Sequence, residues 1–203
     1  MQLIKVFYIL VLFSFSSCKQ AATKANLNVI NEEKIKTILV DKNQLKLIPE
    51  KGQWFYKKQP FNGFAVVYFS DGSIAEKTGF FNGKKQGVSN KWFQDGTLQK
   101  TSYYQQNKLN GIVKVWWKSG AIASEYNYTD GVKHGVQQRW YSSGQLAKKR
   151  NLNKGKEEGM QQAWLENGKI YVNYEAKNGR IFGMNRANLC YKLNKEEVQY
   201  ESK

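Results

Sequence analysis

The sequence predicts an all-β protein, an elongated single-sheet β-meander of 24-residue hairpin repeats. Two regularities carry this prediction. Large aromatic residues stand five positions after a recurring glycine, and a second glycine stands nine positions after it, in five successive copies. The recurring glycines are spaced by 24 residues without an insertion: Gly63, Gly87, Gly111, Gly135, Gly159 and Gly183. Self-similarity at a fixed period of this length is typical of repeat architectures, in which each unit buries its apolar face against its neighbours.

Within one repeat the pattern predicts a β-hairpin. The residues one and five positions after the leading glycine are apolar in every copy, as are Ile112 and Trp116 in the third. Residues four apart on a strand share a face, so we expect these positions to face the core. An Asp, Ser or Asn precedes or lies near the second glycine, as at Gly72, which indicates a tight two-residue hairpin turn. A second strand follows and ends at another turn, such as the one at Gly83.

The first residues predict export and lipid attachment. Residues 1–17 contain one early cation, Lys5, then an apolar stretch, then two serines directly before Cys18. This arrangement is typical of a secretory signal peptide and resembles the lipobox of bacterial lipoproteins, in which the cysteine is acylated after cleavage. Phe15 stands where that pattern prefers Leu. Acyl chains on Cys18 would hold the protein on a membrane of the bacterial cell envelope, on its periplasmic or cell-surface face. Ordinary cleavage or a retained anchor is the alternative.

Composition divides the rest of the chain into four parts. Residues 18–31 are polar and without periodicity, which suits a flexible tether. Residues 32–62 are expected to form an N-terminal cap and a half-repeat, residues 63–182 the five repeats, and residues 183–203 a C-terminal cap strand and tail. With Cys18 acylated, Cys190 is the remaining thiol. We interpret it as a small buried residue of the last strand, with pairing to another chain as the alternative.

The repeat pattern, from about Trp54 to Met184, resembles the MORN repeat variant found in bacterial proteins of the YwqK-type antitoxin family. The resemblance implies a meander in which successive hairpins add to one elongated, twisted sheet. It implies little about chemistry, because repeats of this kind are scaffolds on which sites are placed. Two departures are local: Asn107 replaces a turn glycine and can adopt positive φ, and Ala176 replaces an aromatic residue.

The residue inventory argues against an enzyme. His134 is the only histidine and falls in a predicted turn, where we expect it to be solvated. The acidic pairs, such as Glu157 with Glu158, are adjacent on strands and therefore point to opposite faces. No phosphate-binding loop is present, since the glycines punctuate hairpins. We therefore expect no catalytic residue, no metal site and no cofactor.

A candidate binding stripe follows from residues six positions after each leading glycine. It consists of Phe69, Phe93, Trp117 and Tyr141, with Leu165 in the fifth repeat. Lys91 and Arg139 lie beside it, and the chain carries a formal net charge of +16. The stripe could be a ligand platform with an attraction to anionic surfaces. Alternatively, its rings pack among themselves, and the cations line a solvated face that prevents strand aggregation.

The combined reading is a non-enzymatic, envelope-anchored repeat lipoprotein, monomeric, that acts as a protein-interaction module. Its expected partner is a protein with an acidic surface. Export argues against nucleic acid as a partner. Two alternatives stay open: an antitoxin or immunity protein that occupies a partner toxin, and a binder of a cell-surface polymer or anionic lipid through the aromatic and basic stripe.

Overall fold

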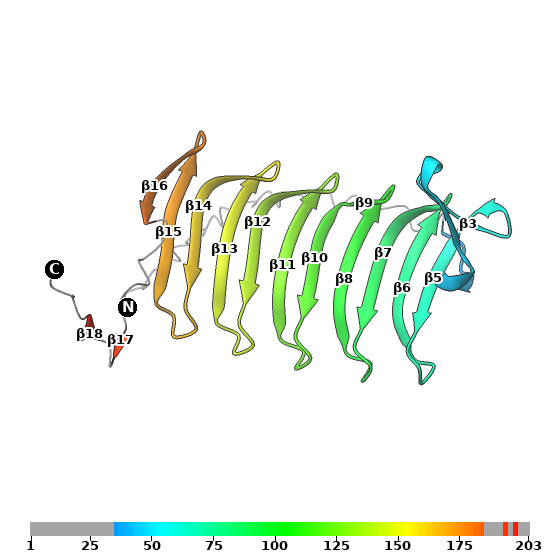
Figure 1. Ribbon diagram of the computed structural model, residues 1–203, viewed down its shortest axis with the longest axis horizontal. Coiled ribbons are helices and arrows are strands. Elements are labelled where there is room, and N and C mark those ends of the chain that lie inside the picture. Colours follow the sequence, from blue (N-terminus) through cyan, green and yellow to red (C-terminus); the bar gives the residue numbers. More distant parts are fainter. Residues whose placement is uncertain (1–34, 185–192, 195–196, 199–203) are drawn as a thin grey trace, which may run out of the picture.

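The computed structural model describes residues 35–184, 193–194 and 197–198 (Figure 1). The predicted signal peptide, Cys18, the tether and Cys190 lie outside the described residues. No helix in the described part of the chain is long and apolar enough to cross a membrane. The strands before the repeats are β1 (Leu39–Asp41), β2 (Lys46–Ile48), β3 (Gln53–Tyr56) and β4 (Gln59–Pro60), with short 3-10 turns η2 (Lys42–Gln44) and η3 (Pro49–Lys51).

The five hairpins follow in chain order. Their strands are β5 (Gly63–Tyr68), β6 (Ile74–Phe81), β7 (Lys84–Trp92), β8 (Leu98–Gln105), β9 (Lys108–Leu109), β10 (Gly111–Trp116), β11 (Ile122–Thr129), β12 (Val132–Trp140), β13 (Leu146–Asn153), β14 (Lys156–Trp164) and β15 (Ile170–Lys177). The strands β16 (Arg180–Met184), β17 (Leu193–Asn194) and β18 (Glu197–Val198) come after them.

One 13-stranded sheet contains all the hairpins (Figure 1). Its order is β1-β5-β6-β7-β8-β10-β11-β12-β13-β14-β15-β16, with β9 paired to β8. Every pairing is antiparallel except that of β1 with β5, which is parallel. The prediction of an all-β meander of hairpins is therefore confirmed.

The turns alternate between two kinds along the sheet. At one end of each hairpin the loop has three residues, as where the amide of Phe69 donates to the carbonyl of Ser73 at 2.8 Å. Gly72 closes this loop with φ of +83°, a value that favours glycine. The prediction of a two-residue turn at this end is wrong. The residue six positions after the leading glycine, here Phe69, follows the end of β5, and its backbone closes a three-residue loop. This geometry fits a type I turn followed by a left-handed residue.

The turns at the opposite end have two residues. Phe81 pairs with Lys84, and the two residues between them have φ of +48° at Asn82 and +73° at Gly83. Positive φ at both central positions defines the type I′ turn, whose twist matches that of the strands. Asn107, which replaces the glycine in the second repeat, adopts φ of +70°, as expected for a residue that tolerates this region.

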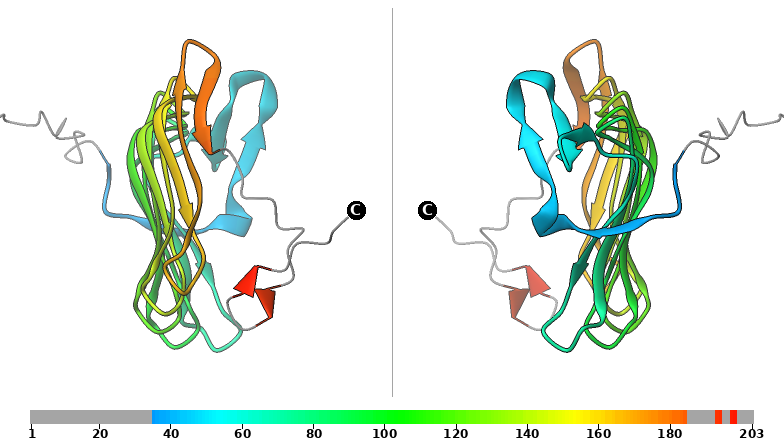
Figure 2. Two further views of the ribbon diagram at one scale, coloured as in Figure 1. Left: turned by 90° about the vertical axis from the view of Figure 1, so that its left-hand side faces the viewer. Right: turned by 90° about the vertical axis from the view of Figure 1, so that its right-hand side faces the viewer.

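An N-terminal cap covers one end of the sheet. The strands of the sheet bow, and the small sheet β2-β3-β4 stands on their concave side (Figure 2). The Phe80 ring meets Trp54 of the cap at 6.3 Å and Phe61 at 5.7 Å between centroids. The amide of Gly83 donates to the carbonyl of Phe61 at 2.7 Å. The apolar core of the protein therefore lies between the cap and the first hairpin.

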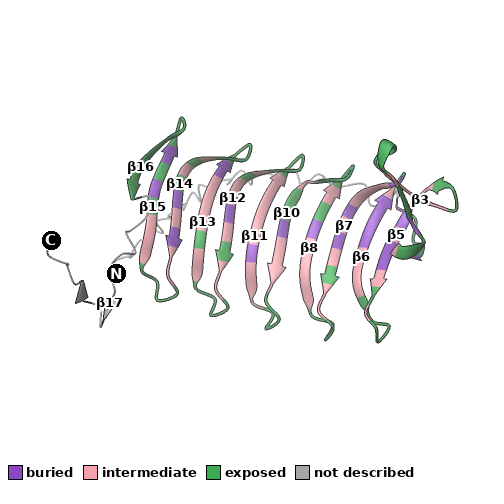
Figure 3. Ribbon diagram, in the orientation of Figure 1, coloured by how far each residue is buried: buried purple, intermediate pink, exposed green. Residues whose placement is uncertain are grey.

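The face that is buried differs from the prediction. Residues two positions after each leading glycine are buried in every repeat: Ala65, Ser89, Val113, Gln137 and Gln161. Tyr68 is 44% exposed and Ile112 is 40% exposed, although positions five and one were expected to face the core. That prediction is wrong. The side chains at position two lie on the concave side of the sheet, and because side chains alternate along a strand, those at positions one and five lie on the convex side. Figure 3 shows that most of the remaining sheet is only half-buried.

Candidate binding face

One row of residues crosses the concave face from strand to strand. Cross-strand pairing joins Val67, Glu76, Lys91, Lys100, Val115, Ser124, Arg139, Lys148, Ala163 and Val172 in that order. Directly paired residues share a face, and this face also carries Ala65 and Phe80, which pack against the cap. We call these residues the concave row. It contains four cations and a single carboxylate, that of Glu76.

The fold places like charges directly opposite each other twice in this row. Lys91 pairs with Lys100 across β7 and β8, and Arg139 pairs with Lys148 across β12 and β13. Like charges at directly opposite positions destabilise a sheet by roughly the amount that opposite charges stabilise it, about 0.2 to 1 kcal/mol. The sequence accepts this cost in the second and fourth repeats. An anionic ligand on the concave face would remove it.

The first basic cluster surrounds Glu76. The amine of Lys91 lies 3.0 Å and that of Lys42 3.6 Å from its carboxylate. Partial burial works in the opposite direction, but the hydrogen bond from Lys91 and the two positive charges hold the pKa of Glu76 below its usual value. Burial and the charges of Lys42, Lys91 and Lys100 lower the pKa of Lys85, against the attraction of Glu76. Positive charge therefore outweighs negative charge in this cluster.

The second basic cluster consists of Arg139, Lys148 and Arg150. Burial and the charges of Arg150 and Arg139 lower the pKa of Lys148, while Glu157 acts in the opposite direction. Arg150 donates to one carboxylate oxygen of Glu157, and the hydroxyl of Tyr174 donates to the other at 2.6 Å. These partners hold the pKa of Glu157 below its usual value, although burial opposes them. Burial and this hydrogen bond raise the pKa of Tyr174 to about 12.

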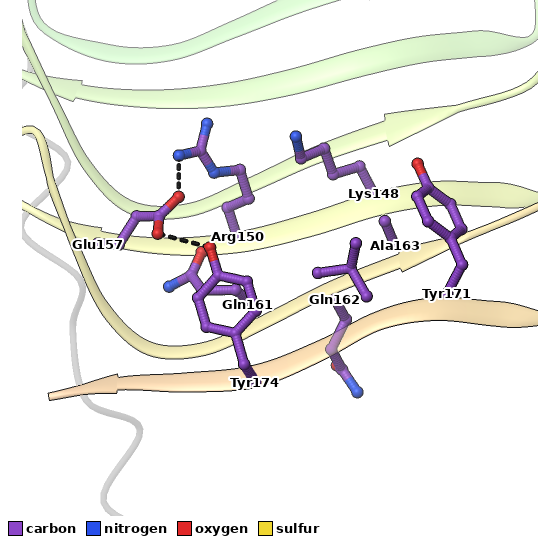
Figure 4. A pocket seen from close by; sticks show the side chains of 9 residues that line it. Lys148, Arg150, Glu157, Gln161, Gln162, Ala163, Tyr171 and Tyr174 are labelled. Atoms are coloured by element: carbon purple, nitrogen blue, oxygen red, sulfur yellow. Dashed lines mark hydrogen bonds and ion pairs between the residues drawn. The ribbon is translucent and has the colours of Figure 1, made fainter. Parts of the chain in front are cut away.

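A hollow of about 330 Å³ lies beside the second basic cluster. Figure 4 shows its lining side chains over β13, β14 and β15, with Gln162 pointing away from the group. The lining residues are Lys148, Arg150, Glu157, Gln161, Gln162, Ala163, Tyr171, Val172 and Tyr174. The hollow thus combines two cations, one carboxylate, two phenol rings and a buried amide. We call it the distal hollow.

The buried amides repeat in the fourth and fifth hairpins. The Nε2 atom of Gln161 donates to the carbonyls of Asn151 at 2.7 Å and Gly159 at 3.2 Å, where the leading glycine interrupts the ladder. The same atom of Gln137 makes the matching bonds one repeat earlier. Both side chains are buried, and their Oε1 atoms have no hydrogen-bond donor among the described residues. A buried acceptor without a donor costs free energy, so these two amides reduce the stability that their Nε2 hydrogen bonds provide.

The structure separates the two parts of the predicted binding stripe. The aromatic members follow the last residue of their strands and close the three-residue turns, at one long edge of the sheet: Phe69, Phe93, Trp117 and Tyr141. Trp117 is 39% exposed and the other three are half-buried. The hydroxyl of Tyr141 donates to the carbonyl of Trp164 at 2.9 Å. Lys91 and Arg139 lie instead within the strands, in the concave row.

The remaining residues that could take part in catalysis or metal binding do not form a common site among the described residues. His134 is exposed, as predicted, but belongs to β12, and its Nδ1 atom accepts from the amide of Lys154 at 3.4 Å. Among the described residues, no group of three His, Cys, Asp or Glu side chains could hold a metal ion.

Sequence reasoning missed Lys100, Lys148 and Arg150. The sequence contains the information that would have identified Lys100 and Lys148. In each hairpin, the residue four positions after the leading glycine pairs with the residue thirteen positions after it. Placing that register on the sequence sets Lys100 opposite Lys91 and Lys148 opposite Arg139. The missing information was the length of the turn, which fixes the register.

Comparison with known proteins supports the repeat assignment. Residues 109–130 and 133–154 match the model of the MORN repeat variant. The matched segments include β10 to β13, and their similarity indicates a repeat module for protein interaction or membrane binding. No curated protein matches the chain.

Proposed function

We propose that the protein is a non-enzymatic, envelope-anchored interaction module whose concave face binds an anionic partner. The observation that carries this proposal is the pair of like-charge contacts in the concave row, Lys91 with Lys100 and Arg139 with Lys148. A folded sheet gains nothing from these contacts, whereas complementary charge on a partner accelerates association and favours correct pairing.

The rest of the fold suits this role. The repeats form one continuous sheet, and the cap lies at its N-terminal end, beside β5 (Figure 1). The concave face beyond the cap carries tyrosines near the cations, as where Lys85 lies over the ring of Tyr104 and Lys133 over that of Tyr126. Rings and cations together can bind a partner by stacking and by charge.

The antitoxin alternative and the polymer alternative both require an anionic partner on this face. They differ in the class of that partner. An acidic protein surface would fit the first, and an acidic polymer or lipid the second.

Neighbouring positions on β8 test which face binds. Tyr104 lies on the concave face and Tyr103 on the convex face, by strand alternation. A photo-crosslinking amino acid at Tyr104 should give adducts in intact cells, and the same residue at Tyr103 should give few. The Lys91→Gln/Lys100→Gln double variant should lose the adduct at Tyr104. Adducts at Tyr103 alone, or adducts at Tyr104 that survive the double substitution, would contradict the proposal.

The anchor is tested separately with Cys18→Ser. Acyl chains contribute about 0.8 kcal/mol per buried methylene group, whereas a surface Lys contributes only about 1 kcal/mol near an anionic membrane. The variant should therefore lose radiolabelled fatty acid and appear in the soluble fraction at high salt. A variant that stays in the membrane fraction at high salt would overturn the lipoprotein assignment.

A further inference from the structure

We propose that Asn178 is a site of spontaneous deamidation, and that the isoaspartate formed there releases the strand β16 from the sheet. An asparagine side chain reacts most readily with the next backbone amide when the next residue is glycine, which has no Cβ to obstruct the approach. The chain contains five such dipeptides: Asn62-Gly63, Asn82-Gly83, Asn110-Gly111, Asn167-Gly168 and Asn178-Gly179. Hydrogen bonds hold the first four in place, and the fifth lacks them.

The reaction needs water and no other reactant. The backbone nitrogen of Gly179 loses its proton to hydroxide and attacks Cγ of Asn178. The new C–N bond closes a succinimide ring, and the side-chain nitrogen leaves as ammonia. Water then opens the ring at one of its two carbonyls, which gives aspartate or isoaspartate.

Two of the dipeptides occupy equivalent turns with the same backbone geometry. Asn82 and Gly83 have φ of +48° and +73°, and Asn178 and Gly179 have φ of +52° and +74°. Ring closure brings the glycine nitrogen alongside Cβ of the asparagine, a geometry outside the type I′ turn. Each turn must therefore open locally before it reacts, and the contacts that resist opening set the relative rates.

The cap holds the turn at Asn82 closed. The buried Gly83 donates its amide to the carbonyl of Phe61 at 2.7 Å, and its carbonyl accepts from the amide of Trp54 at 2.7 Å. The Nε2 atom of Gln53 donates to the carbonyl of Asn82 at 2.9 Å. Opening this turn breaks all three hydrogen bonds, so Asn82 should be protected.

In three other dipeptides a hydrogen bond restricts rotation of the asparagine side chain. These bonds join Asn62 to the amide of Lys36 at 3.0 Å, Asn110 to the side chain of Gln105 at 2.7 Å, and Asn167 to the amide of Lys169 at 3.0 Å. We expect slow reaction at all three.

The turn at Asn178 has no comparable restraint. In every earlier turn of this kind, the second residue donates its amide to a carbonyl of the unit before it, as Gly155 does to Lys133 at 2.8 Å. Among the described residues, the amide of Gly179 makes no such bond and the side chain of Asn178 has no hydrogen-bond partner. Both residues are exposed, and no heavy atom lies within 4 Å of the position that a Cβ of Gly179 would take.

Isoaspartate would change the last hairpin, because it adds a methylene group to the backbone of the turn. A two-residue turn fixes the register of its strands, and the longer link cannot keep Lys177 opposite Arg180. The strand β16 pairs with β15 alone in the sheet, and all of its residues are exposed. Few other contacts therefore oppose its release.

Peptide mapping of the full-length protein in detergent tests the site. The folded protein is incubated in mildly alkaline buffer, and mass spectrometry of its peptides follows the conversion of each asparagine. Conversion should be at least about tenfold faster at Asn178 than at Asn82, since the net contribution of the hydrogen bonds at Asn82 must be lost first. In denaturant the two sites should react at similar rates, because the dipeptide is the same.

Matched substitutions by glutamine separate the two turns. Gln106 occupies the equivalent position of the second repeat with φ of +49°, so glutamine fits this turn, and its longer side chain closes a ring more slowly. Asn178→Gln should remove most of the isoaspartate formed by the folded protein, as measured with an isoaspartyl methyltransferase. Asn82→Gln should leave that amount unchanged.

Hydrogen exchange tests the effect on the sheet. Amides of β16 should exchange faster in aged wild type than in aged Asn178→Gln. Conversion of Asn82 as fast as that of Asn178 in the folded protein, or no conversion of Asn178, would overturn the site. Conversion of Asn178 with unchanged exchange in β16 would overturn the release of the strand.

Discussion

The two ends of the concave face have the same backbone geometry and opposite chemistry. In the first hairpin, Ala65 and Phe80 are buried beneath the cap, and Phe80 is only 1% exposed. In the fourth and fifth hairpins, the equivalent surface holds Arg150, Glu157 and Gln161 around an open hollow. The difference follows from what covers the sheet. Position two changes from Ala65 beneath the cap to Gln161 in the fifth hairpin, whereas position seventeen stays apolar, as Phe80 and Leu152.

This contrast assigns stability and binding to different parts of the repeat sheet. The capped end supplies a compact apolar core, so the repeats beyond the first hairpin can place like charges opposite each other without unfolding the sheet. The burial pattern in Figure 3 follows the same division, with the most extensive buried region near the cap. Stability should therefore depend mostly on the capped end, and binding on the open end.

The largest expected effect is at the capped end. Phe80→Ala removes a ring that contacts both Trp54 and Phe61, and should lower the free energy of unfolding by about 3 to 5 kcal/mol. Leu152→Ala, at the equivalent position of the fourth repeat, should cost about 2 kcal/mol, the low end for a buried Leu, since Leu152 is not among the described residues of the capped core. Chemical denaturation of both variants measures the difference. Equal losses would mean that the cap adds no stability to the first hairpin.

An intermediate effect is expected at Glu157. Glu157→Gln removes the charged acceptor of Tyr174 and Arg150, and should cost about 1 to 2 kcal/mol at neutral pH. The pKa of Glu157 is lowered on folding, so its contribution exists above its ordinary pKa and is lost as pH falls through the lowered value. Unfolding measurements at neutral and acidic pH should thus show that the variant and wild type converge in acid. A constant difference across this range would contradict the charge-based account.

The same substitution should change the titration of Tyr174. Its pKa of about 12 reflects burial and the bond to Glu157, so the variant should ionise at a lower pH than wild type. The contribution of Tyr174 to stability is complete below its ordinary value of about 10 and is lost as pH rises toward 12. Phenolate absorbance, compared with Tyr174→Phe to isolate this ring, measures the shift. An unchanged midpoint in Glu157→Gln would show that burial alone raises the pKa.

The smallest effect is expected at the hairpin edge. Trp117 is 39% exposed, so Trp117→Ala should change the free energy of unfolding by about 1 kcal/mol or less. Thermal melting measures this change. A large loss of stability would show that the aromatic residues of the predicted stripe belong to a second core. A partner that binds wild type but not this variant would instead show that the edge, as well as the concave face, takes part in binding.

The local features of the fold could be predicted from sequence because each depends on neighbours in the chain. The positive φ of Gly72 and of Gly83 follows from the glycine spacing, which marks both turns, but the sequence did not predict the three-residue length of the turn at Gly72. The choice of buried face could not be predicted this way. Positions one and two alternate on the strand, and the apolar character of Ile112 and Trp116 favoured the wrong side.

The sequence by itself determined the repeat length, the hairpins and the positions of their turns, since glycine, asparagine and aspartate act within a few residues of where they stand. Only the tertiary structure decided that the sheet curls toward position two, that Lys42 joins Lys91 at Glu76, and that Tyr174 meets Glu157. These contacts join residues from different strands or from the cap. They depend on register, curvature and packing across the sheet, which no short stretch of sequence specifies.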